Sequence, residues 1–246
     1  MRWFALADLH LSLSGDKPMD VFGPLWRDHA ARMAAAWDAR VGEDDVVLLA
    51  GDLSWARTLA EAADDLAWIH ARPGRKVLGR GNHDSWWGKP LGKVRAALPP
   101  SCTLLHHEAL EIDRRVLVGA RGWTSPDDPG AQPGDGAVFA RELERLRLSV
   151  EDADRRLDPA LPRTAMVHFP PWLRGRPPTA VVRILQEARV TACVYGHLHG
   201  EDHSLARTGM HGGILFHFVA ADAVGFAPVP IHTDVDLEFD VEGAAS

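Results

Sequence analysis

This sequence has few cysteines, no long apolar run and no excess of basic residues. Its 246 residues include only two cysteines, Cys102 and Cys193, which lie far apart in dissimilar surroundings. A disulfide framework is thereby excluded, and a single disulfide is not expected. The first apolar run, residues 3–7, is too short for a signal peptide or a membrane span. The formal net charge is −7, whereas most nucleic-acid-binding proteins carry a basic excess. We therefore expect a cytoplasmic protein with no membrane partner, and nucleic acid is not its expected partner.

The remaining composition is that of an ordinary globular protein. Hydrophobic residues make up 46% of the chain and charged residues 25%, which is enough apolar material for a large buried core. The length fits one large domain and leaves little room for a second. We expect a single domain over residues 1–246.

Short apolar runs alternate with segments that have apolar residues at helical spacing. Each run ends in Gly, Asn, Asp or His and predicts a buried strand; the runs are residues 3–7, 46–50, 76–78, 116–119, 164–167 and 192–195. The helical spacing predicts helices over residues 28–40, 59–71, 139–157 and 177–188. This alternation favours an α/β fold. Beyond Gly212, strands predicted at 214–219 and 235–241 have no helix between them, which indicates a second, partly antiparallel sheet. Residues 124–136 form a Gly/Pro/Asp-rich loop, which is either a surface connection or a lid.

Five polar clusters follow five of the predicted strands. They are Asp8-Leu9-His10, Gly51-Asp52, Gly81-Asn82-His83-Asp84, His168 and Gly196-His197-Leu198-His199. Chance gives roughly one Asp-x-His in such a composition but only roughly 0.06 Gly-His-x-His, and below roughly 0.001 Gly-Asn-His-Asp. The last of these motifs contains the only asparagine in the chain. The ordered set is therefore far more informative than any single motif.

The residue types in these clusters suit a pair of metal ions. Ligands gather at the carboxyl ends of strands in open α/β sheets, so five such ends can share one crevice. If the chain stays extended through each motif, Asp8 and His10 point the same way, as do His197 and His199. Carboxylate, imidazole and amide ligands suit first-row divalent ions. Asp52, alone at its strand end, is suited to bridge two cations, which together can generate hydroxide and clamp a phosphoryl group.

The clusters, in this order, resemble those of the calcineurin-like metallophosphoesterase superfamily, and the segments around Asp52 and Asn82 are similar to its bacterial branch of predicted phosphohydrolases. The resemblance implies a four-layer α/β/β/α sandwich with two mixed β-sheets flanked by helices. It also implies a two-metal centre, and the oxygen and nitrogen ligands permit manganese, iron or zinc there. One metal would be held by Asp8, His10, Asp52 and His199, and the other by Asp52, Asn82, His168 and His197. His83 would face the substrate as a catalytic residue.

One departure from that resemblance concerns the protein serine/threonine phosphatases of the superfamily. They carry an acidic residue and an arginine where this chain has Trp55 and Ala56, with Arg57 one place later. The acid that orients the catalytic histidine in those enzymes is therefore missing, and Asp84 is the candidate to replace it. This disfavours a protein phosphatase.

The expected function is hydrolysis of a small phosphodiester or phosphomonoester, with a slight preference for diesters. A nuclease of the same superfamily is the alternative, and a non-catalytic metal-binding scaffold is a third. Trp55, Trp86 and Trp87 lie near the motifs and either stack on a nucleotide substrate or wall the pocket. His203, His211 and His217 follow the last motif and could approach the site.

Overall fold

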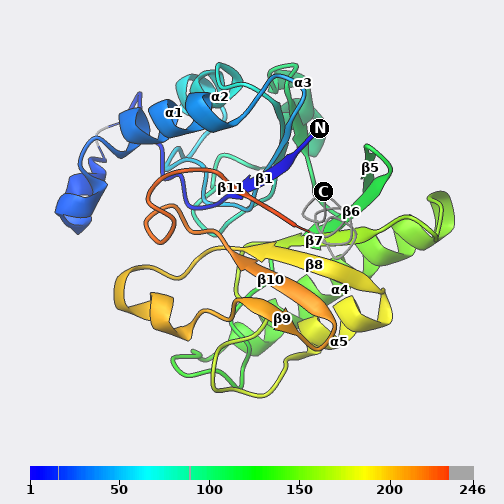
Figure 1. The fold of residues 1–246 in the computed structure, drawn as a ribbon. Coiled ribbons are helices and arrows are strands. Elements are labelled where there is room, and N and C mark those ends of the chain that lie inside the picture. Colours follow the sequence, from blue (N-terminus) through cyan, green and yellow to red (C-terminus); the bar gives the residue numbers. More distant parts are fainter. Residues whose placement is uncertain (16, 89, 233–246) are drawn as a thin grey trace, which may run out of the picture.

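Two β-sheets lie face to face, and helices cover the outer face of each, in the computed structural model, which describes residues 1–15, 17–88 and 90–232 (Figure 1). The first sheet has the order β11-β1-β2-β3-β4. Strands β1 to β4 are parallel, and β11 is antiparallel to β1. The strand bounds are β1 (Trp3–Leu6), β2 (Val46–Leu49), β3 (Arg75–Leu78), β4 (Cys102–Leu104) and β11 (Val229–Pro230).

The second sheet has six strands in the order β5-β6-β7-β8-β10-β9. Its four central strands are parallel, and β5 and β9 pair antiparallel at the two edges. The strand bounds are β5 (Leu110–Ile112), β6 (Arg115–Ala120), β7 (Arg163–Val167), β8 (Val190–Tyr195), β9 (Gly209–His211) and β10 (Ile214–Phe218). Both sheets are therefore mixed, as the resemblance implied.

Alternation along the strands sorts their side chains into separate cores. In β1, Phe4 and Leu6 pack toward the helices, whereas Trp3 and Ala5 face the second sheet. The strand period of two residues produces this division. The core between the sheets contains Val46, Leu48, Val77, Leu117, Met166 and Val194. Two further cores lie between each sheet and its helices. The four-layer sandwich is confirmed.

The helices α1 (His29–Arg40), α2 (Ala63–His70) and α3 (Leu91–Ala97) cover the first sheet, and α4 (Asp135–Arg156) and α5 (Ala180–Glu187) cover the second (Figure 1). The Thr179 hydroxyl accepts a hydrogen bond from Val181 N and begins α5. Three 3₁₀ segments are η1 (Met19–Phe22), η2 (Pro24–Trp26) and η3 (Gly200–Leu205). None of the helices in the described ranges has the length and apolarity that crossing a bilayer requires.

Several predicted boundaries differ from the structure. Helix α4 begins at Asp135, inside the predicted loop, because the Asp135 carboxylate accepts bonds from Trp123 Nε1 and Gln132 N. Helix α2 begins at Ala63, four residues after the predicted start at residue 59, and turns precede it. The short elements β4, β5, β9 and α3 were not predicted, since three to seven residues carry little periodic signal. The strand predicted at residues 235–241 lies outside the described residues.

Candidate active site

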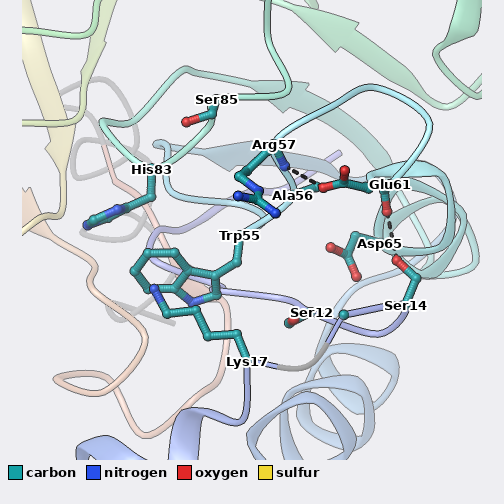
Figure 2. A pocket seen from close by; sticks show the side chains of 11 residues that line it. Ser12, Ser14, Lys17, Trp55, Ala56, Arg57, Glu61, Asp65, His83 and Ser85 are labelled. Atoms are coloured by element: carbon teal, nitrogen blue, oxygen red, sulfur yellow. Dashed lines mark hydrogen bonds between the residues drawn. The ribbon is translucent and has the colours of Figure 1, made fainter.

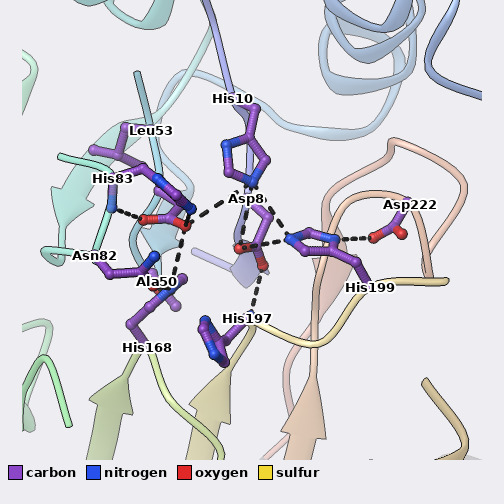
Figure 3. A network of polar contacts seen from close by, with 12 residues as sticks. Asp8, His10, Ala50, Leu53, Asn82, His83, His168, His197, His199 and Asp222 are labelled. Atoms are coloured by element: carbon purple, nitrogen blue, oxygen red, sulfur yellow. Dashed lines mark hydrogen bonds and ion pairs between the residues drawn. The ribbon is translucent and has the colours of Figure 1, made fainter. Parts of the chain in front are cut away.

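The five polar clusters meet at the carboxyl ends of β1, β2, β3, β7 and β8, where both sheets contribute (Figure 3). Backbone hydrogen bonds join the loops: Asp8 N donates to Gly51 O at 2.9 Å, and His10 N donates to Asp52 O at 3.0 Å. Gly196 N donates to His168 O at 3.1 Å, which connects the loops of the second sheet. The site is therefore assembled from loops that support one another.

The backbone of these loops is not extended. Asp8, His10, Asp52 and His197 have φ values of 60°, 47°, 53° and 76°. Non-glycine residues seldom adopt this left-handed conformation, and when they do they cluster at functional sites. Asp8 and His10 still meet, but through two left-handed turns rather than through the strand alternation expected from the sequence.

Asp8, His10 and His199 form a first group of candidate ligands. Asp8 Oδ1 lies 3.9 Å from His10 Nε2 and 3.5 Å from His199 Nε2, and the two Nε2 atoms are 3.4 Å apart. Ligands at about 2.0–2.2 Å from one cation stand about 3.0–3.5 Å from each other. Asp8 Oδ1 is buried and has no hydrogen-bond partner among the described residues. This unpartnered oxygen fits a cation.

Asp52, Asn82 and His168 form a second group beside the first. His168 Nε2 lies 3.0 Å from Asn82 Oδ1 and 3.4 Å from Asp52 Oδ2. The same Asp52 oxygen is 3.9 Å from His10 Nε2, so it lies between the two groups. Donor atoms of Asp8, Asp52 and His168 also lie within 4.8 Å of one another. Two cations can therefore share the space between these groups.

His197 lies at the margin of the second group. Its ring centroid is 5.1 Å from that of His168 and 3.9 Å from that of Phe169. Its backbone N donates to Asp8 Oδ2 at 2.9 Å. Burial lowers the pKa of His197 to about 3. The imidazole is therefore neutral at pH 7 and able to coordinate a metal.

The other three candidate histidine ligands differ in the direction of their pKa shifts. Burial lowers the pKa of His10 to about 4. Burial also disfavours the charged forms of His168 and His199, but neighbouring carboxylates outweigh it and raise the pKa of His168 to about 9 and that of His199 to about 10. Against burial, His168 and His10 hold the pKa of Asp52 well below its usual range. A cation entering the site would replace protons shared by these pairs.

Asp222 is a site residue that the sequence analysis missed. Its Oδ1 lies 3.0 Å from His199 Nδ1, and its Oδ2 lies 3.0 Å from His203 Nε2. A carboxylate on the far nitrogen orients a metal-binding histidine and leaves Nε2 facing the metal. The Ala50 carbonyl lies 3.0 Å from His168 Nδ1 and plays the same orienting role for His168. The one sequence feature that could have identified Asp222 as a site residue is its position just after an apolar run. The five polar clusters also follow apolar runs.

The three later histidines differ in their distance from the site. His203 reaches its margin through Asp222. His211 Nε2 lies 2.9 Å from the carbonyl of Thr208, and His217 Nε2 lies 3.1 Å from that of His232. Neither of these two contacts a candidate ligand through the hydrogen bonds recorded within the described ranges.

Asp84 is fully buried and connects two of the loops. Its carboxylate accepts hydrogen bonds from the backbone N of Asp52, Leu53, Ser54 and Gly81 and from Trp86 Nε1, at 2.7–3.2 Å. Burial and the nearby Asp52 carboxylate raise the pKa of Asp84 to about 6, and these donors oppose that rise. Asp84 as the acid that orients the His83 imidazole stays a prediction. The hydrogen bonds that Asp84 accepts fix the backbone that carries Asp52.

His83 projects from the site toward solvent. Its side chain is 42% exposed, and Nε2 lies 3.9 Å from Asp52 Oδ2. The Trp55 ring is 4.2 Å away by centroid and also stacks on His10. Burial lowers the pKa of His83, and Asp52 opposes that change. Trp86 and Trp87, in contrast, are buried in the core between the first sheet and its helices, so of the three clustered tryptophans Trp55 borders the site.

Two cavities meet at Trp55 and His83. One, of 510 Å³, is lined mainly by polar side chains, and we call it the polar cavity (Figure 2). It includes Ser12, Ser14, Lys17, Arg57, Glu61, Asp65 and Ser85. The other, of 380 Å³, lies over the first ligand group, and we call it the apolar cavity. It is lined by His10, Met19, Phe22, Leu25, Trp26, His199, Gly200 and Asp222 together with the shared pair.

Comparison with solved structures places this architecture among known proteins. A protein of unknown function, AQ665, from Aquifex aeolicus matches with a TM-score of 0.52 and 12% identity over 96% of this chain and 97% of its own. The phosphopantetheinyl hydrolase PptH from Mycobacterium tuberculosis matches with a TM-score of 0.54 and 16% identity, over 89% and 88% of the two chains. The protein TT1561 of Thermus thermophilus matches with a TM-score of 0.54 and 11% identity, over 94% and 98%. The TM-scores show a shared fold, and at these low identities the matches show the fold alone.

Sequence comparison gives closer but shorter matches. The Gene 66 proteins of Mycobacterium phages D29 and L5 are 44% and 40% identical over 85 and 82 residues, which is 33% of this chain. The matched region spans 39% of the length of each phage protein. The family model of the calcineurin-like phosphoesterases matches residues 1–201, and those residues include all seven metal ligands that the sequence predicted. The chain therefore belongs to the calcineurin-like phosphoesterase family.

Proposed function

We propose that this protein hydrolyses a small phosphodiester, with a phosphomonoester as the second candidate, at a centre of two cations. The observation that carries the proposal is the convergence of buried Asp8, Asp52 and His168 and half-buried His199 beside the partly exposed His83. Manganese, iron and zinc all suit such oxygen and nitrogen donors. Bound cations would neutralise phosphoryl charge and activate water at this position.

Separate residues would bind the cations, orient the histidine ligands and contact the phosphoryl group. Asp8, His10 and His199 would hold one cation, Asn82, His168 and His197 would hold the other, and Asp52 would lie between them. Asp222 and the Ala50 carbonyl fix the imidazoles of His199 and His168 through their Nδ1 atoms. His83 donates a hydrogen bond to the phosphoryl group or a proton to the leaving oxygen.

The two cavities favour a diester over a monoester. A phosphoryl group beside His83 would have open space on both sides of Trp55, 510 Å³ on one and 380 Å³ on the other. A diester has two organic groups to place there, whereas a monoester has one. The substrate is then a small organic phosphoester, with nucleotides among the candidates, since Trp55 offers a ring beside the reacting group.

A nuclease is the alternative within the same family. The net charge of −7 argues against tight binding of a long polyanion. One fold neighbour is named a phosphopantetheinyl hydrolase, which supports a small substrate.

The test measures metal content first and hydrolysis second. The protein is loaded in turn with manganese, iron or zinc, and turnover is compared on bis-p-nitrophenyl phosphate, p-nitrophenyl phosphate and duplex DNA. We expect about two metals per chain and the highest kcat/KM on the diester. Efficient, processive degradation of DNA would favour the nuclease. Two bound metals without hydrolysis of any ester would favour the scaffold and refute the proposal.

A further inference from the structure

One wall of the apolar cavity is formed by apolar side chains that are exposed to solvent and do not pack in the hydrophobic core. Phe22 and Leu25 line the cavity and are 58% and 50% exposed, while Val21, in the same 3₁₀ segment as Phe22, is 69% exposed. Leu13 is also exposed, so four of the large exposed apolar side chains of the described residues fall within residues 13–25. Such a concentration marks a binding surface more often than chance exposure. Folding alone does not explain it.

The floor of the same cavity is the first ligand group. His10 and His199 line it, and Trp26 packs edge-on against both rings, at centroid distances of 5.7 and 5.8 Å. Met19 and Trp26 are buried in the core between the first sheet and its helices, so they hold this wall in place. A molecule whose phosphorus lies between the ligand groups would therefore direct an attached group between Phe22, Trp26 and Trp55.

We infer that the apolar cavity binds a flat aromatic group attached to the phosphorus of the substrate, so that esters carrying such a group are selected over small alkyl esters. This inference rests on the proposed function and adds the substrate class. Three of its walls are aromatic rings, which favour another ring through stacked or edge-to-face contact. A volume of 380 Å³ accommodates one or two fused rings, since a cavity of about 150 Å³ already holds benzene.

The polar cavity takes the other ester group. Lys17 and Arg57 line it together with Glu61 and Asp65, so its formal charges balance. Lys17 Nζ already lies 3.0 Å from the centroid of the Trp55 ring. An apolar ring would displace water there from charged groups with little return. The aromatic group is therefore expected on the Phe22 side of Trp55.

The test uses phosphonates, because each carries a single organic group and is not hydrolysed. Dissociation constants of 1-naphthylphosphonate and methylphosphonate are measured by calorimetry on the metal-loaded protein. We expect the naphthyl compound to bind at least about tenfold more tightly. Phe22→Ala and Leu25→Ala should weaken it about 5- to 30-fold and leave methylphosphonate unchanged. Val21→Ala, beside Phe22 but outside the cavity lining, is the matched control and should change neither.

Two results would overturn the inference. One is equal affinity for the two phosphonates. The other is a naphthyl affinity that is unchanged in Phe22→Ala but falls in Arg57→Ala, which would place the ring in the polar cavity. Failure of the proposed function has a separate signature, because the metal-loaded protein would then leave bis-p-nitrophenyl phosphate intact whichever phosphonate it binds.

Discussion

Replacing Asp84 by asparagine removes one charged acceptor from the centre of the two loops that carry Asp52 and Asn82. The carboxylate accepts five hydrogen bonds, four of them from backbone N–H groups. An asparagine at this position retains one acceptor oxygen. Its NH₂ group would then face either the N–H groups of Asp52 and Gly81 or those on the other side. Backbone N–H groups that now donate to the Asp84 carboxylate would then face the NH₂ group of the asparagine, with no water to replace the lost acceptor.

The size of the effect follows from those unsatisfied groups. A buried donor that loses its partner costs about 1–3 kcal/mol. With two such donors in Asp84→Asn, we expect the free energy of unfolding to fall by about 2–6 kcal/mol. The Asp52 backbone would also shift, so metal affinity should fall about 10–100-fold, as it does when other supports of metal ligands are removed. His83, which makes no recorded contact with Asp84, should keep its accessibility.

The assay pairs urea unfolding of the metal-free protein with metal titration of the folded protein. Asp45→Asn is the matched control, because Asp45 is also buried and accepts bonds from Gly42 N and Arg2 N, but at the opposite end of β2. It should lower stability and leave metal affinity unchanged. If the two variants change metal affinity equally, or if Asp84→Asn unfolds no more easily than wild type, the reasoning about Asp84 is wrong.

Four further outcomes are expected. His83→Ala should keep both metals while kcat falls about 10²–10⁴-fold, and less for esters with a good leaving group; metal analysis with kinetics checks this, and loss of a metal would contradict it. Asp222→Asn should weaken metal binding about 10–100-fold without loss of fold, and unchanged affinity in a metal titration would contradict it. Removing the cations with a chelator should lower the Tm, and returning them should restore it together with hydrolysis; a Tm that does not respond would argue against a built metal site. The Arg156 guanidinium, against burial, holds the pKa of Asp152 below its ordinary value, so its contribution to stability is present above about pH 4 and is lost as pH falls further. Asp152→Ala should therefore lower the urea midpoint more at pH 7 than at pH 2, and an equal loss at both would contradict this.

The sequence alone determined the fold class and the set of candidate ligands. Strands such as β1, β2 and β8 are short apolar runs with a polar cluster immediately after them, and both features are local. The order of those clusters, with the rare Gly-Asn-His-Asp motif, was specific enough to indicate the family before any geometry was known. Local patterns can do this because strand burial and strand ends leave their mark within a few residues.

Tertiary structure decided which side chains support those ligands and which border the substrate. Asp222 reaches His199 only because the chain after β10 returns beside the loop after β8, and no local pattern records that approach. Trp55, Trp86 and Trp87 look alike in sequence, yet Trp55 is only partly buried and borders the site, whereas the core buries the other two. Left-handed turns at Asp8 and His10 bring their side chains together where an extended chain was expected. Such contacts depend on distances between residues remote in sequence, which periodicity and motif spacing do not encode.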